Sequence, residues 1–471
     1  MKIKLHKVGM LDVIFIFFDI LCVVLATIIS HLIISMVNYD EVHFASLIIH
    51  TVAVFLMLYF YDFYSKMLRN KNEIFLSITI SVIISFFIML TFDAIFMDNI
   101  TRYSIIGLII NTILLILLLY IEKLIFLKIV KKVEGVSKLL VIESKYVAND
   151  LARKIKYSYL ELYESWYIQI DTDDPGAVDE LISSQFYKYS SIFISPIIPE
   201  HVKNKLISEA IAMNKEIYLL PNLYNISMFK TEVVQFDDTP AFRMRRFSLN
   251  RVQSFLKRVL DIIVSIIGIV ITSPIMLIAV IAIKIDSPGK IIYKQERVTI
   301  HGKIFNLYKF RTMVSNAEEK TGAVLATEHD PRTTKVGRIL RRFRIDELPQ
   351  FVNVLSGSMS VVGPRPERPI FVEKFCKEIE CYDKRFLVKA GITGFAQVFG
   401  RYDTSVKDKI LYDLLYIKKY SFLLDIKLIL LSIKIIFIKE SSKGVSEKPS
   451  YVTFNGNEKS MEELNKGLIN I

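Results

Sequence analysis

Hydrophobic residues in the first 130 positions form four long runs, at about residues 10–37, 43–64, 74–97 and 103–130. Each run can form a helix that crosses a hydrocarbon core of about 30 Å, which takes about 20 residues. The first run is longer than the apolar region of a signal peptide and lacks a small-residue cleavage pattern. The pattern therefore predicts a four-transmembrane-helix domain over residues 1–132.

Basic residues indicate which loops of this domain face the cytoplasm. They gather before the first run, between the second and third, and at the end of the fourth: Lys2, Lys4, Lys7, Lys66, Arg69, Lys71, Lys128, Lys131 and Lys132. The other two loops contain Asp40, Glu41 and Asp98. Because cytoplasmic loops carry the excess of Lys and Arg, both ends of this domain are predicted to lie in the cytoplasm.

The hydrophobic pattern changes at the end of the fourth run. Short apolar runs at 138–142, 166–170, 191–194 and 217–220 alternate with amphipathic stretches of helical period. This alternation predicts a small parallel β-sheet of Rossmann type over residues 137–248. No glycine follows the first strand, where a dinucleotide-binding domain needs its backbone to approach a pyrophosphate. We therefore interpret the domain as a degenerate one that serves packing, dimerisation or regulation.

A fifth apolar run occupies residues 259–285 and contains Ser273-Pro274 near its middle. Proline removes one helical N–H and clashes with the preceding turn, so a break or kink is predicted at this pair. Basic residues flank the run on both sides, namely Arg251, Lys257 and Arg258 before it and Lys284, Lys290 and Lys294 after it. A re-entrant helix that returns to the same membrane face keeps both flanks in the cytoplasm, and a kinked full crossing is the alternative.

Composition narrows the class of protein. Hydrophobic residues make up 52% of the chain, which excludes a disordered protein and argues against a plain soluble enzyme. Lys and Arg outnumber Asp and Glu by 60 to 48, a net charge of +12. Much of this excess flanks the apolar runs and no nucleic-acid-binding motif is present, so membrane lipid and phosphate-bearing substrates explain it better than nucleic acid. Three cysteines cannot form a framework of several disulfides, which favours a reducing compartment.

Candidate chemistry is concentrated after the fifth run. Lys309 and Arg311 lie two residues apart, which places both cations on one face of a strand. Further along, Arg341 precedes the adjacent acids Asp346 and Glu347. Arginine forks match phosphate oxygens, an acid pair can hold Mg²⁺, and a carboxylate can attack phosphorus to form an acyl phosphate. Cations of this kind also neutralise the charge of a phosphoryl transition state.

Turn-rich segments further along the chain add candidate phosphate-binding groups. They are Gly363-Pro364-Arg365-Pro366, Gly391-Ile392-Thr393-Gly394, Gln397, Gly400 and Arg401. Each signal alone has an ordinary structural explanation, because an acid pair beside arginines is usually a solvated ion-pair cluster and a Pro-Arg-Pro is usually a stiff turn. Their combination after an apolar hairpin points to phosphate chemistry at a membrane.

Residues from about 255 to 438 resemble the bacterial sugar transferase family of monotopic phosphoglycosyl transferases. The resemblance is carried by Lys257-Arg258 with Asp261, Ser273-Pro274, Ser287-Pro288-Gly289, Gln295-Glu296-Arg297-Val298, KFRTM at 309–313, RRFRIDELPQFVNVLSGSMSVVGPRP at 341–366, GITGFAQVFGR at 391–401 and SFLLDIKLIL at 421–430. The whole layout is similar to the long, multidomain branch of that family.

This resemblance implies an enzyme of the EC 2.7.8 type, which moves a sugar 1-phosphate from a UDP-sugar to undecaprenyl phosphate and releases UMP. The reaction is the first membrane step in the assembly of capsule, exopolysaccharide or O-antigen. The resemblance also implies a multi-pass protein of the bacterial inner (cytoplasmic) membrane, with its catalytic domain on the cytoplasmic face. Which sugar is transferred stays open.

The resemblance also assigns roles to individual residues. Asp346 matches the catalytic aspartate that carries a covalent phospho-sugar, and Glu347 matches its partner in a dyad that holds Mg²⁺. Arg341 matches the arginine five residues before that aspartate. Pro364-Arg365-Pro366 matches a motif near the uridine-phosphate site, and Ser273-Pro274 matches the pair that breaks the membrane hairpin. Lys309, Arg311, Gln397 and Arg401 complete the expected substrate-binding set.

The expected architecture is a membrane protein with α and α/β parts. It comprises a four-helix transmembrane bundle over 1–132, a Rossmann-like domain over 137–248, an α/β catalytic domain with a re-entrant helix over 252–439, and a flexible tail over 440–471. Within the catalytic domain, the apolar segment 421–439 is interrupted by charged residues. It predicts an amphipathic helix that lies on the membrane surface.

Two other functions fit the same sequence less well. A non-catalytic membrane scaffold or regulator of polysaccharide assembly has no reason to keep Asp346 and Glu347 together with their arginines. A glycosyltransferase moves the sugar without its phosphate and releases UDP instead of UMP. A homodimer is a further expectation, since the additional domains need some role.

Overall fold

A computed structural model describes most of the chain. The described residues are 10–36, 44–61, 71–96, 102–133, 137–145, 163–244, 246–314, 330–400, 404–436 and 469–470. The chain divides into two compact units, residues 1–220 with 449–471, and residues 221–448. The predicted tail over 440–471 lies outside the described residues except for the short strand β11 (Ile469–Asn470).

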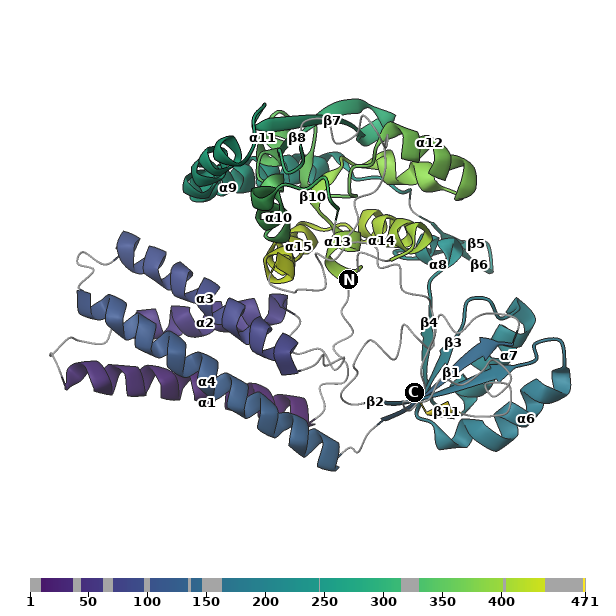
Figure 1. Cartoon of the computed structure of the whole chain (residues 1–471). Coiled ribbons are helices and arrows are strands. Elements are labelled where there is room, and N and C mark those ends of the chain that lie inside the picture. Colours follow the sequence, from purple (N-terminus) through teal and green to yellow (C-terminus); the bar gives the residue numbers. More distant parts are fainter. Residues whose placement is uncertain are drawn as a thin grey trace. The chain divides into compact units, whose positions relative to one another are not determined.

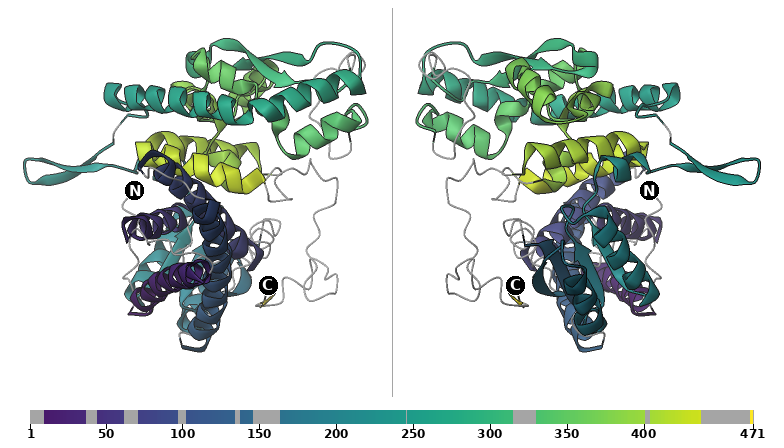
Figure 2. Two further views of the ribbon diagram at one scale, coloured as in Figure 1. Left: turned by 90° about the vertical axis from the view of Figure 1, so that its left-hand side faces the viewer. Right: turned by 90° about the vertical axis from the view of Figure 1, so that its right-hand side faces the viewer.

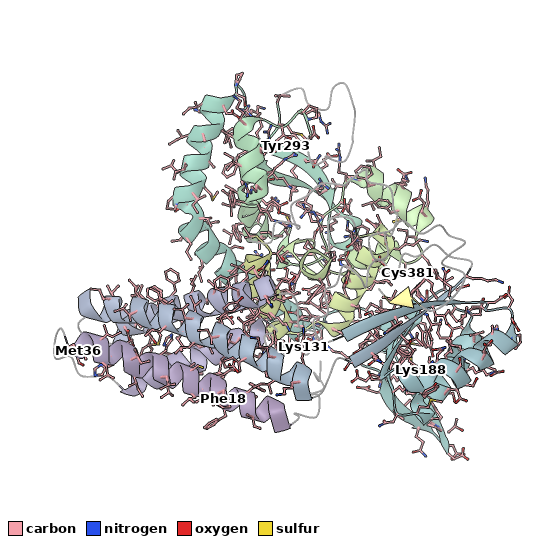
Figure 3. All side chains as sticks on the ribbon, turned by 60° about the horizontal axis from the view of Figure 1, so that its bottom comes forward. Phe18, Met36, Lys131, Lys188, Tyr293 and Cys381 are labelled. Carbon is pink, nitrogen blue, oxygen red and sulfur yellow. The ribbon has the colours of Figure 1, made fainter. Side chains whose placement is uncertain are left out.

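Four helices form an N-terminal bundle: α1 (Met10–Ser35), α2 (Phe44–Phe60), α3 (Lys71–Phe96) and α4 (Arg102–Val133) (Figure 1). Val23, Leu58 and Ile78 belong to the core between them and are fully buried. The outer surface is apolar as well, with Phe18 and Met36 exposed on it (Figure 3). A helix that is apolar on every side requires an apolar surrounding such as lipid.

Three helices of the bundle have membrane-spanning length. The stretches Ile14–Ile33, Lys71–Ile95 and Ile105–Lys132 are long and apolar enough to cross a membrane, whereas α2 has 17 residues. A helix of about 17 residues is at the lower limit for a crossing. The four predicted apolar helices are therefore all present, and the second is the shortest. A further helix of sufficient length and hydropathy lies in the second unit, at Arg251–Asp286.

The remainder of the first unit is a parallel sheet with helices packed on it. Its strands are β1 (Ser137–Ser144), β2 (Tyr163–Ile170), β3 (Ser191–Ile194) and β4 (Glu216–Leu219), which match the four predicted strands. They are parallel in the order β2-β1-β3-β4, and β11 pairs antiparallel with β2. The core joins the sheet to α6 (Pro175–Gln185), η1 (Phe186–Lys188) and α7 (Glu200–Ala212).

The second unit contains short elements around one long helix. In chain order they are α8 (Leu223–Ser227), β5 (Glu232–Phe236), β6 (Thr239–Arg243), α9 (Arg251–Asp286), β7 (Ile292–Val298), η2 (Ile300–Gly302), β8 (Ile304–Phe310), α10 (Lys335–Arg342), η3 (Ile345–Glu347), α11 (Gln350–Leu355), β9 (Ser360–Val362), α12 (Pro369–Glu378), η4 (Tyr382–Leu387), β10 (Gly391–Thr393), α13 (Phe395–Phe399), α14 (Val406–Lys419) and α15 (Phe422–Ile436).

Three two-stranded sheets lie in this unit. β7 and β8 form an antiparallel hairpin, and β9 and β10 pair in parallel. The β5–β6 hairpin extends away from the other elements of the unit (Figure 2) and leaves Phe236 and Phe242 exposed. The main core gathers Leu307, Val354 and Leu428, which come from β8, α11 and α15. Its strands and helices are distant in sequence, so long-range packing holds the unit together.

Of the predicted break or kink at Ser273-Pro274, the break is not present, because the helix α9 continues through both residues. Pro274 has no N–H to donate to the Val270 carbonyl, which is four residues earlier. The Ser273 hydroxyl donates to that same carbonyl at 2.8 Å and so replaces the missing bond. Helical geometry is therefore kept at a position where proline alone predicts an end.

Both halves of α9 pack against the same unit. Lys257 and Asp261 are buried in its first half, and Ala279 and Ile283 are buried in its second half. Between them, a Cβ atom on Gly268 would lie 2.7 Å from the Phe351 ring, so glycine is needed for this close approach. The opposite side of α9 is exposed and apolar, with Phe255, Ile263, Val270, Ile271, Leu277 and Ile278.

Candidate active site

The acid pair lies on a short turn that follows α10. The helix α10 begins at Thr334, whose hydroxyl accepts a hydrogen bond from the Gly337 N–H at 3.0 Å. A Cβ atom on Gly337 would lie 2.1 Å from the Thr312 carbonyl oxygen, so only glycine lets α10 approach the end of β8. Arg344 takes a left-handed conformation with φ 55° and ends this segment. A new turn, η3, therefore begins at Ile345, contains Asp346 and packs against β8.

Glu347 is the neutralised member of the pair. Its Oε1 atom accepts hydrogen bonds from Lys309 Nζ at 3.0 Å and from Arg365 Nη2 at 2.9 Å. Burial by itself raises the pKa of this carboxyl group, but the charges of Lys309, Arg365 and Arg344 outweigh it. The pKa of Glu347 consequently stays well below its usual range, and the residue is a carboxylate throughout the neutral range.

Asp346 is held differently, although it is adjacent. Its exposed fraction is 8%, and it forms no hydrogen bond within the part of the chain that the structure describes. Burial raises the pKa of Asp346 to about 6, and the Glu347 charge adds to the rise, while Lys309, Arg341 and Arg365 lower it. A carboxylate without hydrogen-bond donors is a reactive oxygen nucleophile or a ligand for a cation.

The two cations of the KFRTM segment have separate roles. Lys309 reaches Glu347, as predicted for a group at the acid pair. Arg311 does not, because its guanidinium donates to the Ser287 and Pro288 carbonyls at 2.5 and 2.8 Å. These carbonyls lie at the C-terminal end of α9, where backbone acceptors lack helical partners. The Arg311 guanidinium therefore caps a helix, and its predicted part in substrate binding stays a prediction.

Arg341 lies close enough to lower the pKa of Asp346. Its Nε donates to the Thr312 hydroxyl at 2.9 Å, which ties α10 to the residues after β8. Its Nη1 lies 3.5 Å from the Thr333 hydroxyl, and the residue is half-buried. The sequence-predicted group of Lys309, Arg341, Asp346 and Glu347 is thus brought together.

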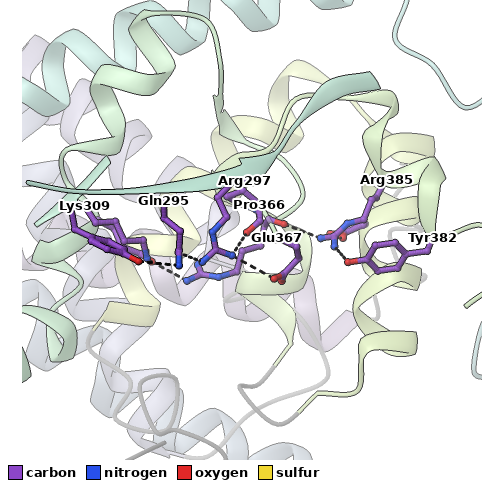
Figure 4. Close-up of polar contacts among 11 residues, drawn as sticks. Gln295, Arg297, Lys309, Pro366, Glu367, Tyr382 and Arg385 are labelled. Atoms are coloured by element: carbon purple, nitrogen blue, oxygen red, sulfur yellow. Dashed lines mark hydrogen bonds and ion pairs between the residues drawn. The ribbon is translucent and has the colours of Figure 1, made fainter. Parts of the chain in front are cut away.

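The turn that carries Arg365 is fixed through its backbone (Figure 4). Four consecutive carbonyls each accept a hydrogen bond from a different donor: Pro364 O from Gly391 N at 2.9 Å, Arg365 O from Arg385 Nη2 at 3.0 Å, Pro366 O from Arg297 Nη1 at 3.1 Å and Glu367 O from Val298 N at 3.0 Å. The predicted stiff turn therefore also contributes a charged group to the site, since its Arg365 side chain contacts Glu347.

A pocket lies beside the acid pair. Its lining residues are Arg297, Leu307, Lys309, Glu347, Gln350, Arg365 and Pro366. Three of these side chains are cationic, which suits an anionic ligand. Two predicted groups are not seen at the pair: within the described residues no contact links Gln397 on α13 to it, and Arg401 is outside the described residues.

The donor set suits Mg²⁺ better than a metal that needs a protein cage. No group of three or more His, Cys, Asp or Glu side chains converges among the described residues. Mg²⁺ is often held by one or two carboxylates, with water and substrate phosphate as its other ligands. Within the described part of the chain Asp346 accepts no hydrogen bond, and Glu347 is its neighbour, so the residues present fit such an ion.

Sequence reasoning missed a set of buried charges that fasten α9. Lys257 Nζ donates to Asp425 at 2.7 Å, to the Tyr416 hydroxyl at 2.9 Å and to the Val362 carbonyl at 2.8 Å. One turn later, Asp261 accepts from Ser360 and from the Val361 N–H, both at 2.8 Å. Charged residues four apart in an otherwise apolar helix are the signal, because burying a charge in such a helix requires a partner.

Comparison with known proteins gives two findings. The sequence profile of the family described as bacterial sugar transferase matches residues 252–439. Over 188 residues the chain is 44% identical to the UDP-N-acetylgalactosamine-undecaprenyl-phosphate N-acetylgalactosaminephosphotransferase of Aeromonas hydrophila, which covers 39% of this chain and 44% of that protein. Over 271 residues it is 33% identical to the UDP-glucose:undecaprenyl-phosphate glucose-1-phosphate transferase of Escherichia coli, which covers 56% and 58%.

A shorter relative is matched over most of its length. It is the putative undecaprenyl-phosphate N-acetylgalactosaminyl 1-phosphate transferase of Bacillus subtilis, 48% identical over 152 residues, which are 30% of this chain and 84% of that protein. The chain spans only about half the length of the two longer relatives. Each of the three relatives therefore matches only part of this chain. The acid pair and its cations lie inside the matched profile.

Proposed function

The chain belongs to the bacterial sugar transferase family, and we propose that it transfers a sugar 1-phosphate from a UDP-sugar to undecaprenyl phosphate with release of UMP. One observation carries the proposal: among the described residues no donor reaches the buried Asp346 carboxylate, which lies beside Glu347, and Lys309 and Arg365 neutralise Glu347. The names of the relatives supply the substrate class, because each of them acts on undecaprenyl phosphate.

The chemistry proceeds in two displacements at phosphorus. An Asp346 oxygen forms a bond to the sugar-bearing phosphorus, while the bond from that phosphorus to UMP breaks and UMP keeps the electron pair. A phosphate oxygen of undecaprenyl phosphate then bonds to the same phosphorus, and the Asp346 carboxylate leaves with its electron pair. Lys309, Arg341 and Arg365 orient the anionic groups and reduce their mutual repulsion.

Mg²⁺ bound at Asp346 and Glu347 would neutralise phosphate charge and favour the ionised form of the nucleophile. Glu347 stays ionised because Lys309 and Arg365 lie beside it. At least one carboxylate of the pair is therefore available to bind a divalent ion. Glu347 also holds Lys309 and Arg365 next to the reacting Asp346 carboxylate.

Packing of α9 supports the proposed re-entrant arrangement on the cytoplasmic face of the inner membrane. A straight crossing separates the two ends of a helix by a whole bilayer, yet Lys257 and Ile283 are both buried in one compact unit. The exposed side of α9 is apolar over most of its length, and α15 adds exposed Leu423. We therefore propose that this surface dips into one leaflet and brings the acid pair to the level of the lipid phosphates.

The proposal is tested by nucleotide release from the full chain in detergent, with Mg²⁺, undecaprenyl phosphate and a panel of UDP-sugars. We expect UMP from one donor, and its loss in Asp346→Asn. The matched control is Asp383→Asn, an exposed aspartate of the same unit, which should retain activity. UDP instead of UMP indicates glycosyl transfer, and no release with any donor supports the scaffold function. UMP release that persists in Asp346→Asn rejects the nucleophile.

A further inference from the structure

Arg385 lies directly behind the turn that carries Arg365. It belongs to η4 and is 5% exposed, so its charge is removed from water. Its Nη1 donates to the Tyr382 hydroxyl at 2.5 Å, and its Nη2 donates to the Arg365 carbonyl at 3.0 Å (Figure 4). The same Nη2 lies 2.8 Å from an oxygen of Asp413 on α14, which is 1% exposed.

Burying a guanidinium costs free energy, because the charge loses its hydration. Desolvation of an ion pair often cancels its Coulomb attraction, and an apolar pair of similar volume is frequently as stable. What the apolar pair cannot supply is a donor at a defined point and angle. Arg385 supplies one to a single peptide carbonyl, that of the residue whose side chain reaches Glu347.

Arg365 depends on its backbone for its orientation. Its side chain is 44% exposed, and Glu347 is its only hydrogen-bond or ion-pair partner among the described residues. The Arg365 side chain donates to Glu347, while the Arg365 carbonyl accepts from Arg385. A rotation of this peptide therefore moves the guanidinium away from the acid pair.

We propose that Arg385 is a positioning residue, which holds the Arg365 guanidinium on Glu347 by fixing the Arg365 carbonyl, and that Asp413 holds Arg385 in place. This inference rests on the proposed function, because it assigns the network to the same reaction. Arg385 itself does not touch the acid pair. Its effect on the reaction is exerted through Arg365.

Arg385→Lys is the informative variant because it retains the charge opposite Asp413. A single ammonium on a flexible stem cannot reproduce the two-nitrogen fork that reaches both Tyr382 and Arg365. We expect kcat/KM for UMP release to fall on the order of 10-fold to 100-fold, the usual cost of a small misplacement of a catalytic group. The stability control is Leu428→Ala, a fully buried core position on α15 whose apolar side chain takes no part in the hydrogen bonds of Arg385 and Arg365.

A double-mutant cycle separates positioning from general destabilisation. In an Arg365→Ala background, Arg385→Lys should change kcat/KM by less than about twofold, since the group it positions is absent. Leu428→Ala should keep its full effect in that background. If the effects of Arg385→Lys and Arg365→Ala on kcat/KM multiply in the double variant, the proposal is overturned. An unchanged kcat/KM in Arg385→Lys alone overturns it as well.

Hydrogen exchange of the full chain gives a readout that does not need activity. The backbone amides of Gly363, Arg365, Glu367 and Arg368 should exchange faster in Arg385→Lys and at the wild-type rate in Leu428→Ala. Equal exchange in Arg385→Lys and wild type rejects the positioning role even if no donor is turned over. If the wild type releases no nucleotide but exchange changes as expected, the proposed reaction fails and the support of the turn by Arg385 stands.

Discussion

Lys257 should be among the most sensitive positions of the second unit, although it lies far along the chain from the acid pair. Its ammonium is 6% exposed and donates three hydrogen bonds, to Asp425, Tyr416 and the Val362 carbonyl. Lys257→Met retains the length of the side chain and removes the charge. The change leaves Asp425, which is 1% exposed, without its countercharge.

The magnitude follows from what remains around Asp425. Breaking a buried ion pair from one side costs about 3–5 kcal/mol. Tyr416 still donates to Asp425 at 2.8 Å, so we expect the lower end, about 3 kcal/mol of unfolding free energy. Replacing both partners, in Lys257→Met with Asp425→Leu, removes the uncompensated charge and should restore most of this loss. Tyr416 then has the Val362 carbonyl as its acceptor, at 3.3 Å.

Pulse proteolysis in urea on the full chain in detergent measures this loss, with fragments from residues 252–439 followed. The chain's only tryptophan, Trp166, is in the first unit, so its fluorescence does not report on the second. Lys384→Met is the control, because its ion pair with Asp383 is exposed and should be worth less than about 1 kcal/mol. A loss below about 1 kcal/mol for Lys257→Met, or a double variant no better than the single one, would refute the reasoning.

Three further predictions concern the site. Gly394→Ala should abolish UMP release and lower Tm, because its Cβ would lie 2.1 Å from the Gly363 carbonyl oxygen; wild-type activity would contradict the backbone packing. Arg311→Met should lower Tm by loss of the cap on α9 while the KM for donor in the folded fraction stays within about twofold; a large rise in KM would return Arg311 to substrate binding. UMP release should rise as pH passes through about 6, since Asp346 attacks only when deprotonated, and higher Mg²⁺ should move this rise to lower pH; a rate independent of pH between 5 and 7 contradicts it.

Local patterns were sufficient for the elements. The four strands of the first unit follow from short apolar runs between amphipathic stretches, and the structure has them within a few residues of the predicted ends. The break at Ser273-Pro274 was the exception, because the Ser273 hydroxyl satisfies the carbonyl that Pro274 leaves unpaired. The segment 421–439 predicts an amphipathic helix whose charged residues face outward. In α15, however, Lys434 is 2% exposed and is buried in the interior.

The amino-acid sequence by itself determined the apolar helices, the parallel strands and the identity of the reactive groups, because these depend on spacing and residue type within a few turns. Only the tertiary structure decided that Lys309 neutralises Glu347 while Arg311 caps α9, although the two cations are two residues apart. It also decided that Glu347 accepts hydrogen bonds from Lys309 and Arg365, whereas Asp346 accepts none from the described residues. The groups that neutralise and hydrogen-bond Glu347 come from β8 and the Arg365 turn, which are 38 and 18 residues away from it. The physical reason is that contacts over such separations depend on tertiary packing, which the spacing of residues within one helix or strand does not specify.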